Sequence, residues 1–474
     1  MVEHIKKTAG AHVVRKVKEK DKVSSRNEAK SLVSIMTAEE IEKKFIPELQ
    51  LVSAGLFSIL KTLSVKEFQP DREMCFLLSK EVDRVETFLD DYGATNNRRF
   101  FFFRELVASI RWIDVAIFQA VHILARFDNY SLALNSTERK QFISELRGAL
   151  NFYISGLTQL AMALQDEARN LELVPGEAPY EGKIGFGLEK KMLPADLGQE
   201  AIRNEQEVII EILKKFLEVA EDFSLYVNTI RALADISEES LENFRSAFNR
   251  IQSLYDSYLK NTRAENELPD LKKIRGHVSV PLHLLEIGRA LMHFYERHSD
   301  RIRSDAFSVK IAHLVDKTQI RDNVKDFVLK QALVFVEIGK RVSGQIFRSI
   351  GSDPDEYILE TRGLVIPAYR VEDFHIRPIM PLTQIAGKYG TDSYLFFNRS
   401  KYNLKSPIEL AIAIPDIRET LAEENAALML RGPRKAVVEM ANFLSEKCGA
   451  YEKTITRELL ETQSARLDRS GRKV

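Results

Sequence analysis

Between about Ala38 and Ile350, apolar residues recur every three or four positions, which is the spacing of one face of an α-helix. No fixed-period sequence repeat underlies this pattern. The segments that carry it average more than about 20 residues, and helices of that length bury their apolar faces against one another. A bundle of long antiparallel helices is therefore predicted. The clearest stripe consists of Phe101, Leu106, Ile110, Ile113, Ile117, Val121 and Leu124.

Breaks rich in glycine and proline divide this helical region. The expected helices cover residues 38–63, 71–91, 97–124, 137–170, 199–234, 237–260, 281–298 and 323–350. A loop is predicted over residues 171–198, which hold eight glycines and prolines in all. This loop separates the first part of the bundle, 38–170, from the second part, 199–350. Residues 351–362 are predicted to be a linker.

The overall composition is that of a folded chain with no strong electrostatic preference. Hydrophobic residues make up 45% of the sequence, so disorder is not the dominant state. The 69 basic and 69 acidic residues balance, which gives no bulk attraction to nucleic acid or membrane. Two distant cysteines, Cys75 and Cys448, exclude a disulfide framework and a cysteine-based zinc site. We expect a cytoplasmic protein without a membrane span.

The first thirty residues hold nine Lys or Arg against four Asp or Glu and have almost no apolar periodicity. Residues 1–37 are therefore interpreted as a flexible basic arm.

Three features of the helical region suggest a function but have simpler explanations. Gly182, Gly185 and Gly187 before Lys190 resemble a phosphate-binding loop, but they do not lie between a strand and a helix. The aromatic run 100–103 points all round a helix and is expected to be buried. Five histidines lack metal-binding spacing and are expected to be ordinary core or surface residues: His277, His283, His293, His298 and His313. We predict no metal site, no cofactor and no independent catalytic site in the helices.

The last quarter of the chain has a different pattern. Strand-like runs lie at 364–366, 394–397 and 427–430, with a short extended segment at 402–405. Helical runs follow at 376–388, after Pro407 and at 434–447. The predicted order over 363–449 is βαββαβα, an α+β open-faced sandwich, and residues 450–474 are predicted to be a charged helical tail. The whole chain is therefore predicted to be an α+β multidomain protein.

Two motifs in this region resemble those of HPr, the histidine-containing phosphocarrier of the sugar phosphotransferase system. The segment from Glu372 to Pro378 reads Glu-Asp-Phe-His-Ile-Arg-Pro and is similar to the family's Gly-Leu-His-x-Arg-Pro. The segment Asn403-Leu404-Lys405-Ser406 is similar to the family's second motif, in which a serine precedes a short helix. The resemblance implies an HPr-like fold over 363–449.

The residue types around His375 suit a transferable phosphoryl group. A neutral imidazole is nucleophilic near pH 7. A histidine at the start of a helix places the N–H groups of Ile376 and Arg377 near the new anion, and the Arg377 guanidinium adds a charge-assisted clamp. Pro378 lies in the first turn, where a missing N–H costs little. His375 is the predicted phosphoacceptor, and Arg377 with the Ile376 N–H is the predicted phosphate site.

Ser406 has two compatible interpretations. In the family this serine is the target of a regulatory kinase, and the resemblance implies the same role here. As the residue before Pro407, it also suits a helix N-cap. Ile408 and Leu410 are expected to form an apolar docking surface beside it.

The sequence departs from the family pattern at four positions. Asp373 replaces the glycine and places a negative charge near the phosphate, while Ile379, Met380 and Pro381 alter the packing below it.

The predicted function is a phosphorylation-responsive regulator that signals through the helical module. Its expected partners are an enzyme I-like phosphoryl donor, an HPr-type kinase and an unidentified protein bound by the helices. The alternative is an adaptor whose HPr-like domain only docks partners. Any enzymatic role of the protein is predicted to be at most that of a covalent phosphoryl carrier.

Overall fold

The computed structural model describes residues 35–63, 70–175, 204–230, 236–298 and 311–463. Most of the predicted basic arm lies outside these residues. So do the predicted loop from residue 176 onward, with its glycine cluster, and the end of the predicted tail from residue 464. The chain divides into two compact units, residues 1–52 and residues 53–474.

The described part of the first unit is helical from its first turn. Thr37 and Glu40 form a capping box, in which Glu40 N donates to Thr37 Oγ1 at 3.2 Å and Thr37 N donates to Glu40 Oε2 at 3.1 Å. The cap starts α2 (Ala38–Glu40), which continues through the π-helix η1 (Ile41–Phe45) into α3 (Ile46–Leu63). The predicted helix over residues 38–63 is therefore confirmed.

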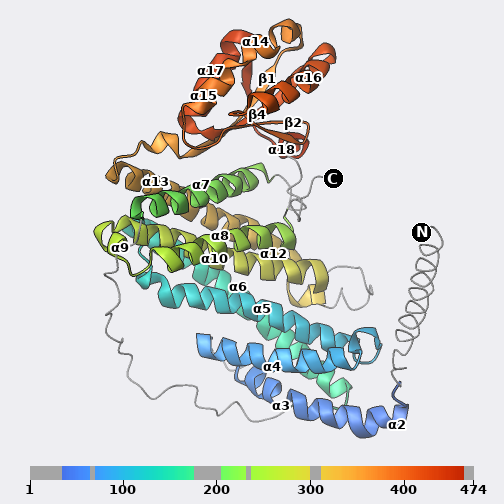
Figure 1. Ribbon diagram of the computed structural model, residues 1–474. Coiled ribbons are helices and arrows are strands. Elements are labelled where there is room, and N and C mark those ends of the chain that lie inside the picture. Colours follow the sequence, from blue (N-terminus) through green and yellow to red (C-terminus); the bar gives the residue numbers. More distant parts are fainter. Residues whose placement is uncertain (1–34, 64–69, 176–203, 231–235, 299–310, 464–474) are drawn as a thin grey trace, which may run out of the picture. The chain divides into compact units, whose positions relative to one another are not determined.

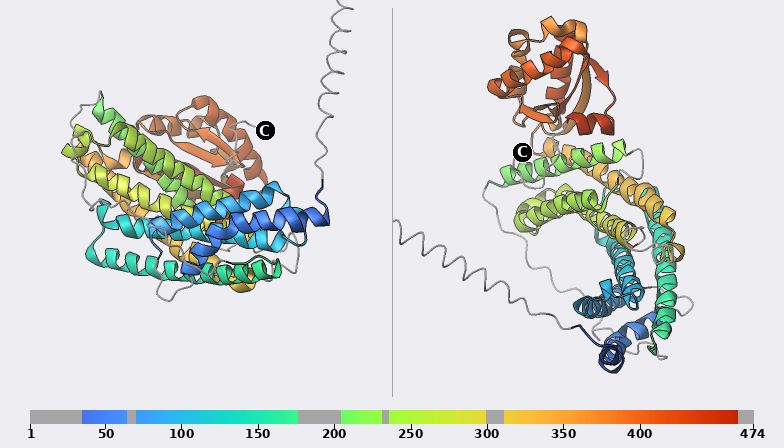
Figure 2. Two further views of the ribbon diagram at one scale, coloured as in Figure 1. Left: turned by 90° about the horizontal axis from the view of Figure 1, so that it is seen from below. Right: turned by 90° about the vertical axis from the view of Figure 1, so that its right-hand side faces the viewer.

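The second unit begins with long helices, shown in Figure 1 and from two further directions in Figure 2. Five of them, α5, α6, α7, α8 and α10, are each longer than twenty residues, and α5 packs against α4, α6 and α10. The helices and π-helices are α4 (Arg72–Asp91), α5 (Phe101–Arg126), α6 (Ser136–Asn170), α7 (Glu205–Thr229), α8 (Glu238–Tyr258), α9 (Arg263–Glu267), α10 (Asp270–His293), η5 (Phe294–His298), α12 (Lys317–Asp322), η6 (Asn323–Leu329) and α13 (Lys330–Ser349).

Side-chain caps explain why several predicted helix starts are confirmed. Asp71 accepts from Glu73 N at 3.1 Å and from Met74 N at 2.8 Å, so α4 starts directly after it. Asn135 and Ser237 cap α6 and α8 in the same way. The predicted burial of the aromatic run is confirmed for Phe100, Phe102 and Phe103, which are at most 7% exposed, whereas Phe101 is half-buried.

The predicted helix start at Pro281 is wrong. Helix α10 begins at Asp270 and carries Pro281 in its interior. A proline there removes one backbone hydrogen bond. The helix nevertheless continues because α10 packs against α5, α8 and α13, and tertiary packing outweighs the local propensity.

The C-terminal part contains a small antiparallel sheet with helices. Its strand order is β3-β2-β4-β1-β5, and Leu364 of β1 pairs with Leu428 of β4. The predicted βαββαβα order of elements is present. The elements are β1 (Leu359–Ile366), η8 (Ala368–Asp373), α14 (Ile376–Ile379), α15 (Pro381–Gly387), β2 (Tyr394–Phe397), β3 (Ser400–Asn403), α16 (Pro407–Glu423), β4 (Ala426–Pro433), α17 (Arg434–Cys448), β5 (Tyr451–Lys453) and α18 (Arg457–Gln463).

This sheet has a hydrophobic core of its own. The buried cluster extends from Leu364 to Ala450 and contains no residue of the helices before β1. Its centre includes Leu395, Leu430 and Met440, which are at most 1% exposed.

Two elements at the end of the chain were not predicted as they occur. The predicted helical tail begins instead with β5, which pairs with β1 through Gly363 and Lys453. Helix α18 follows and contacts β2 and β4. A Cβ atom at Gly363 would lie 3.2 Å from Leu459 Cδ2, so α18 covers the face of β1 opposite to Leu364. The face that was predicted to be open is thus partly covered.

Two helical stretches are long and apolar enough to cross a membrane by length and composition alone, residues 38–63 and 101–129. The second has 67% of its most apolar window buried among other helices. Core helices of folded proteins meet the same criterion, so these stretches are weak indications of a span.

Candidate functional site

His375 lies at the junction between η8 and α14. It occupies the N-cap position of α14 with extended backbone angles, φ −138° and ψ 172°, and its side chain makes no capping hydrogen bond. The preceding residue, Phe374, is 1% exposed and anchors the junction in the core. The His375 carbonyl accepts from Ile379 N at 3.2 Å. The side chain itself is half-buried and has no hydrogen-bond partner among the described residues.

The residues that were predicted to bind phosphate follow directly. Ile376 and Arg377 are the first two residues of α14, where backbone N–H groups lack an intrahelical acceptor. Arg377 is exposed and forms no ion pair with a described residue. The site therefore combines an imidazole, unpaired backbone donors and an uncommitted guanidinium within three consecutive residues.

Asp373 does not present an isolated negative charge. Its Oδ2 lies 2.8 Å from Arg370 Nε, and the Arg370 Nη2 donates to Lys447 O at 3.0 Å. Arg370 is thereby held between η8 and the end of α17, where it offsets the Asp373 carboxylate.

Pro381 is accommodated by a division of the predicted helix 376–388. The structure has α14 up to Ile379 and a new helix, α15, with Pro381 at its start. Met380 keeps helical angles, and its N–H donates to Ile376 O at 2.8 Å. The proline therefore occupies a position where its missing N–H is tolerated, and the single helix that was predicted is wrong at this point.

Ser406 is the N-cap of α16. Its Oγ accepts from Glu409 N at 3.3 Å, and the Glu409 carboxylate accepts from Asn403 N at 2.6 Å. The cap interpretation is thus confirmed. Near the other end of α16, Arg418 Nη2 lies 3.7 Å from Glu372 Oε2 of η8. Ser406 and Arg418 are about 18 Å apart along the helix, at 1.5 Å per residue. Ser406 therefore lies toward the opposite end of α16 from the contact with η8.

The expected apolar surface beside Ser406 is partly wrong. Leu410 is 1% exposed and belongs to the core, whereas Ile408 and Ile412 are 73% and 56% exposed. Their i,i+4 spacing places the two isoleucines on one outward face of α16. Ile376 on α14 is 42% exposed, and α14 contacts α16.

Four of the five histidines named above have structural partners, and His313 is exposed. His277 is fully buried and its Nε2 accepts from Ala133 N at 3.1 Å, while His283 Nδ1 lies 2.8 Å from Gln119 Oε1. Burial lowers the pKa of His277 to about 4 and that of His283 to about 3. Within the described residues, no group of three or more His, Cys, Asp or Glu side chains is arranged to hold a metal.

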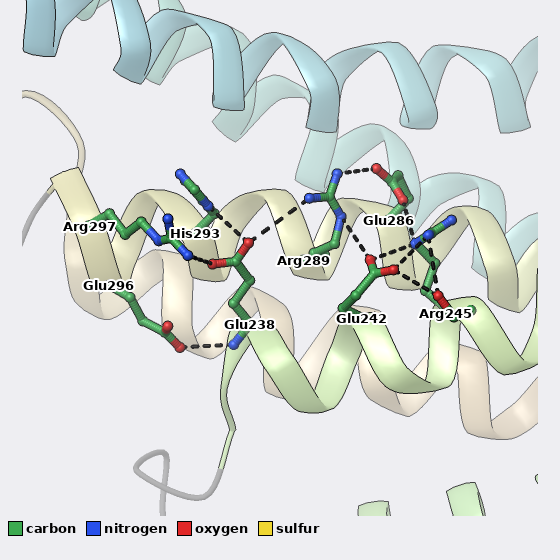
Figure 3. A network of polar contacts seen from close by, with 9 residues as sticks. Glu238, Glu242, Arg245, Glu286, Arg289, His293, Glu296 and Arg297 are labelled. Carbon is green, nitrogen blue, oxygen red and sulfur yellow. Dashed lines mark hydrogen bonds and ion pairs between the residues drawn. The ribbon is translucent and has the colours of Figure 1, made fainter. Parts of the chain in front are cut away.

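An ionic network joins α8 to α10, as Figure 3 shows. His293 Nδ1 lies 2.9 Å from Glu238 Oε1, and its ring stacks on Trp112 at 3.7 Å between centroids. Arg289 lies between Glu238 and Glu242 and also pairs with Glu286. Burial lowers the pKa of His293 below its ordinary value, although Glu238 opposes the shift. Sequence reasoning missed this network because its members are far apart in the chain. Each charge has a partner, which is typical of a structural contact between helices.

Comparison with known proteins gave no match to a family model, to a curated protein or to a solved structure.

Proposed function

We propose that this protein is a phosphorylation-responsive regulator of the phosphotransferase type, in which His375 of an HPr-like domain accepts a phosphoryl group. The observation that carries the proposal is the arrangement of His375 and Arg377. The histidine occupies a helix N-cap without a capping bond, and the arginine that follows two residues later has no ion-pair partner among the described residues. The order of strands and helices around them supports an HPr-like fold for residues 363–449.

The transfer step is a displacement at phosphorus. A lone pair of the neutral His375 imidazole attacks the phosphorus of a phosphorylated enzyme I-like donor, a new N–P bond forms and the bond to the donor breaks. The N–H groups of Ile376 and Arg377 and the Arg377 guanidinium stabilise the negative oxygens.

A helical module attached to a phosphate acceptor suggests a regulator rather than a free carrier. Tyr357, just before β1, stacks on Phe347 of α13 with ring centroids 4.4 Å apart. Arg431 of β4 forms an ion pair with Asp222 of α7. These contacts join the sheet domain to the helices, which supports the proposal that the phosphorylation state affects a protein bound by the helices. The proposed location is the cytoplasm.

The docking alternative is favoured by a different observation, the exposed apolar residues Ile376, Ile408 and Ile412. An adaptor would use them to bind a partner without accepting phosphate.

One experiment separates the two functions. The full chain is incubated with phosphoenolpyruvate and the general phosphotransferase enzyme, and its intact mass is measured. A regulator gains the mass of one phosphoryl group, and His375→Ala prevents the gain. No gain with a donor that phosphorylates HPr would leave only the docking function, which binding of the unphosphorylated enzyme to the chain would then test.

A further inference from the structure

A hollow of about 330 Å³ lies beside the start of α6, far in sequence from His375. Two of its residues come from the turn after α5, and five come from the first three turns of α6. The lining residues are Phe127, Asp128, Arg139, Lys140, Ile143, Ser144 and Arg147. Three of the seven are cations and one is an acid.

Arg139 is held in place before any ligand binds. Its guanidinium carbon lies 5.4 Å from the centroid of the Phe127 ring, and that ring is 2% exposed and stacked on Phe142. Its Nη1 lies 3.8 Å from Asp128 Oδ1, although the Asp128 side chain is fully exposed. A guanidinium fixed over an aromatic ring loses little conformational entropy when it binds an anion.

The other polar groups of the hollow are uncommitted. Lys140 and Arg147 are exposed and form no ion pair with a described residue, and the exposed Ser144 hydroxyl adds a donor. The acids of the same helix segment are engaged elsewhere. Glu138 accepts from Asn135 N at 2.8 Å, and Glu145 accepts from Gln141 Nε2 at 2.9 Å and from Gln331 Nε2. The hollow therefore keeps an excess of positive charge.

We propose that this hollow binds a small molecule bearing a phosphate monoester. Arg139 and Arg147 offer the planar donors that bind phosphate oxygens in pairs, Lys140 adds a point charge, and Ser144 adds a hydroxyl donor. Ile143 provides an apolar wall for the organic part of the ligand. The volume lies at the lower end of the range for ligand pockets, about 300–1,000 Å³, which favours a metabolite over an extended peptide.

Calorimetric titration of the full chain with glucose 6-phosphate tests the proposal. Glucose, inorganic phosphate and a phosphoserine peptide serve as the comparison probes. Saturable binding of glucose 6-phosphate is expected, with weaker binding of inorganic phosphate and none of glucose. The affinity should fall as salt is raised, because the recognition is electrostatic. Tighter binding of the phosphopeptide would overturn the proposal in favour of a protein-docking site.

Variants locate the site. Arg139→Gln combined with Arg147→Gln should weaken glucose 6-phosphate binding by at least about tenfold, since a hydrogen bond to a charged group is worth about 1.5–3 kcal/mol. Arg250→Gln removes an exposed arginine of α8 and should leave the affinity unchanged. Circular dichroism confirms that both variants fold. Undiminished affinity in the double variant, or no binding of any phosphate probe to the native chain, would overturn the proposal.

Discussion

Arg370 and Asp373 form an ion pair immediately before the candidate phosphoacceptor, with Arg370 Nε 2.8 Å from Asp373 Oδ2. The departure from the HPr motif predicted that the Asp373 carboxylate would oppose a phosphate on His375. Because Arg370 offsets that charge, Asp373→Gly should raise the phosphorylation rate by less than about tenfold, consistent with a partly exposed pair worth about 1 kcal/mol or less.

Arg370→Gln is the sharper variant at this position. It leaves Asp373 uncompensated and should slow phosphorylation, and adding Asp373→Gly to it should restore the rate. The measurement is the initial rate of phosphoryl incorporation in all four proteins of this cycle. Equal rates in all four would show that the pair has no influence on the acceptor.

His375 should be the only histidine that carries the phosphoryl group. His375→Ala should abolish labelling, and the label should be acid-labile and alkali-stable, as an N–P bond requires. Arg377→Ala should slow labelling by about tenfold or more, the value of one charge-assisted bond, without lowering the melting temperature. His313→Ala changes an exposed histidine of the helical region and is the matched control. Labelling that persists in His375→Ala would assign the acceptor to another residue.

The Ser406 cap should contribute measurably to the stability of the sheet domain. Ser406→Ala should lower the free energy of unfolding of the sheet domain by about 1 kcal/mol, because Glu409 N loses its acceptor. Ser406→Asp should retain most of that stability, since aspartate also caps helices. If Ser406 is a phosphorylation switch, the aspartate variant should also weaken binding of the general phosphotransferase enzyme relative to the alanine variant. Identical affinities, with no modification by an HPr-type kinase, would leave Ser406 a cap alone.

Residues 353–463 should fold as an isolated fragment. The buried cluster that supports the sheet lies wholly between Leu364 and Ala450. The fragment should show a cooperative thermal transition and dispersed amide NMR signals. A shorter fragment, residues 353–449, keeps all of β1 but lacks β5 and α18, and it should melt at a lower temperature. A longer fragment that remains unfolded would mean that the sheet shares its core with the helices.

The buried Asp114 carboxyl should make the stability of the helical region depend on pH. Its side chain is 1% exposed on α5 and forms no ion pair with a described residue, and burial raises its pKa well above the usual value. The unfolded chain ionises this carboxyl above about pH 4, whereas the folded chain keeps it protonated until its higher pKa is reached. Stability should therefore decrease as pH rises through that interval.

Asp114→Asn isolates the effect. The free energy of unfolding, measured with urea, should decrease less from pH 5 to pH 8 for the asparagine variant than for the native chain. The variant should also be the more stable protein at pH 8. The same decrease in both proteins would show that Asp114 does not set the pH dependence.

Local patterns in the sequence determined most of the helices, several of their starts and the order of elements in the sheet domain. Asp71, Asn135 and Ser406 lie at or near predicted helix starts, because a cap involves residues only two or three positions apart. The candidate acceptor could be predicted for the same reason, since His375, Arg377 and the first N–H groups of α14 are consecutive.

Only the tertiary structure decided which side chains meet across the chain. Three features depend on residues far apart in sequence: the pairing of β5 with β1, the burial of Leu410 beside the exposed Ile408, and the hydrogen bond from Arg370 to Lys447 O. The continuation of α10 through Pro281 likewise depends on packing against other helices. Local propensities are worth at most a few kcal/mol, and long-range burial is large enough to override them. The sequence therefore determined most of the elements and the candidate acceptor motif, and the fold determined the charges and surfaces that surround it.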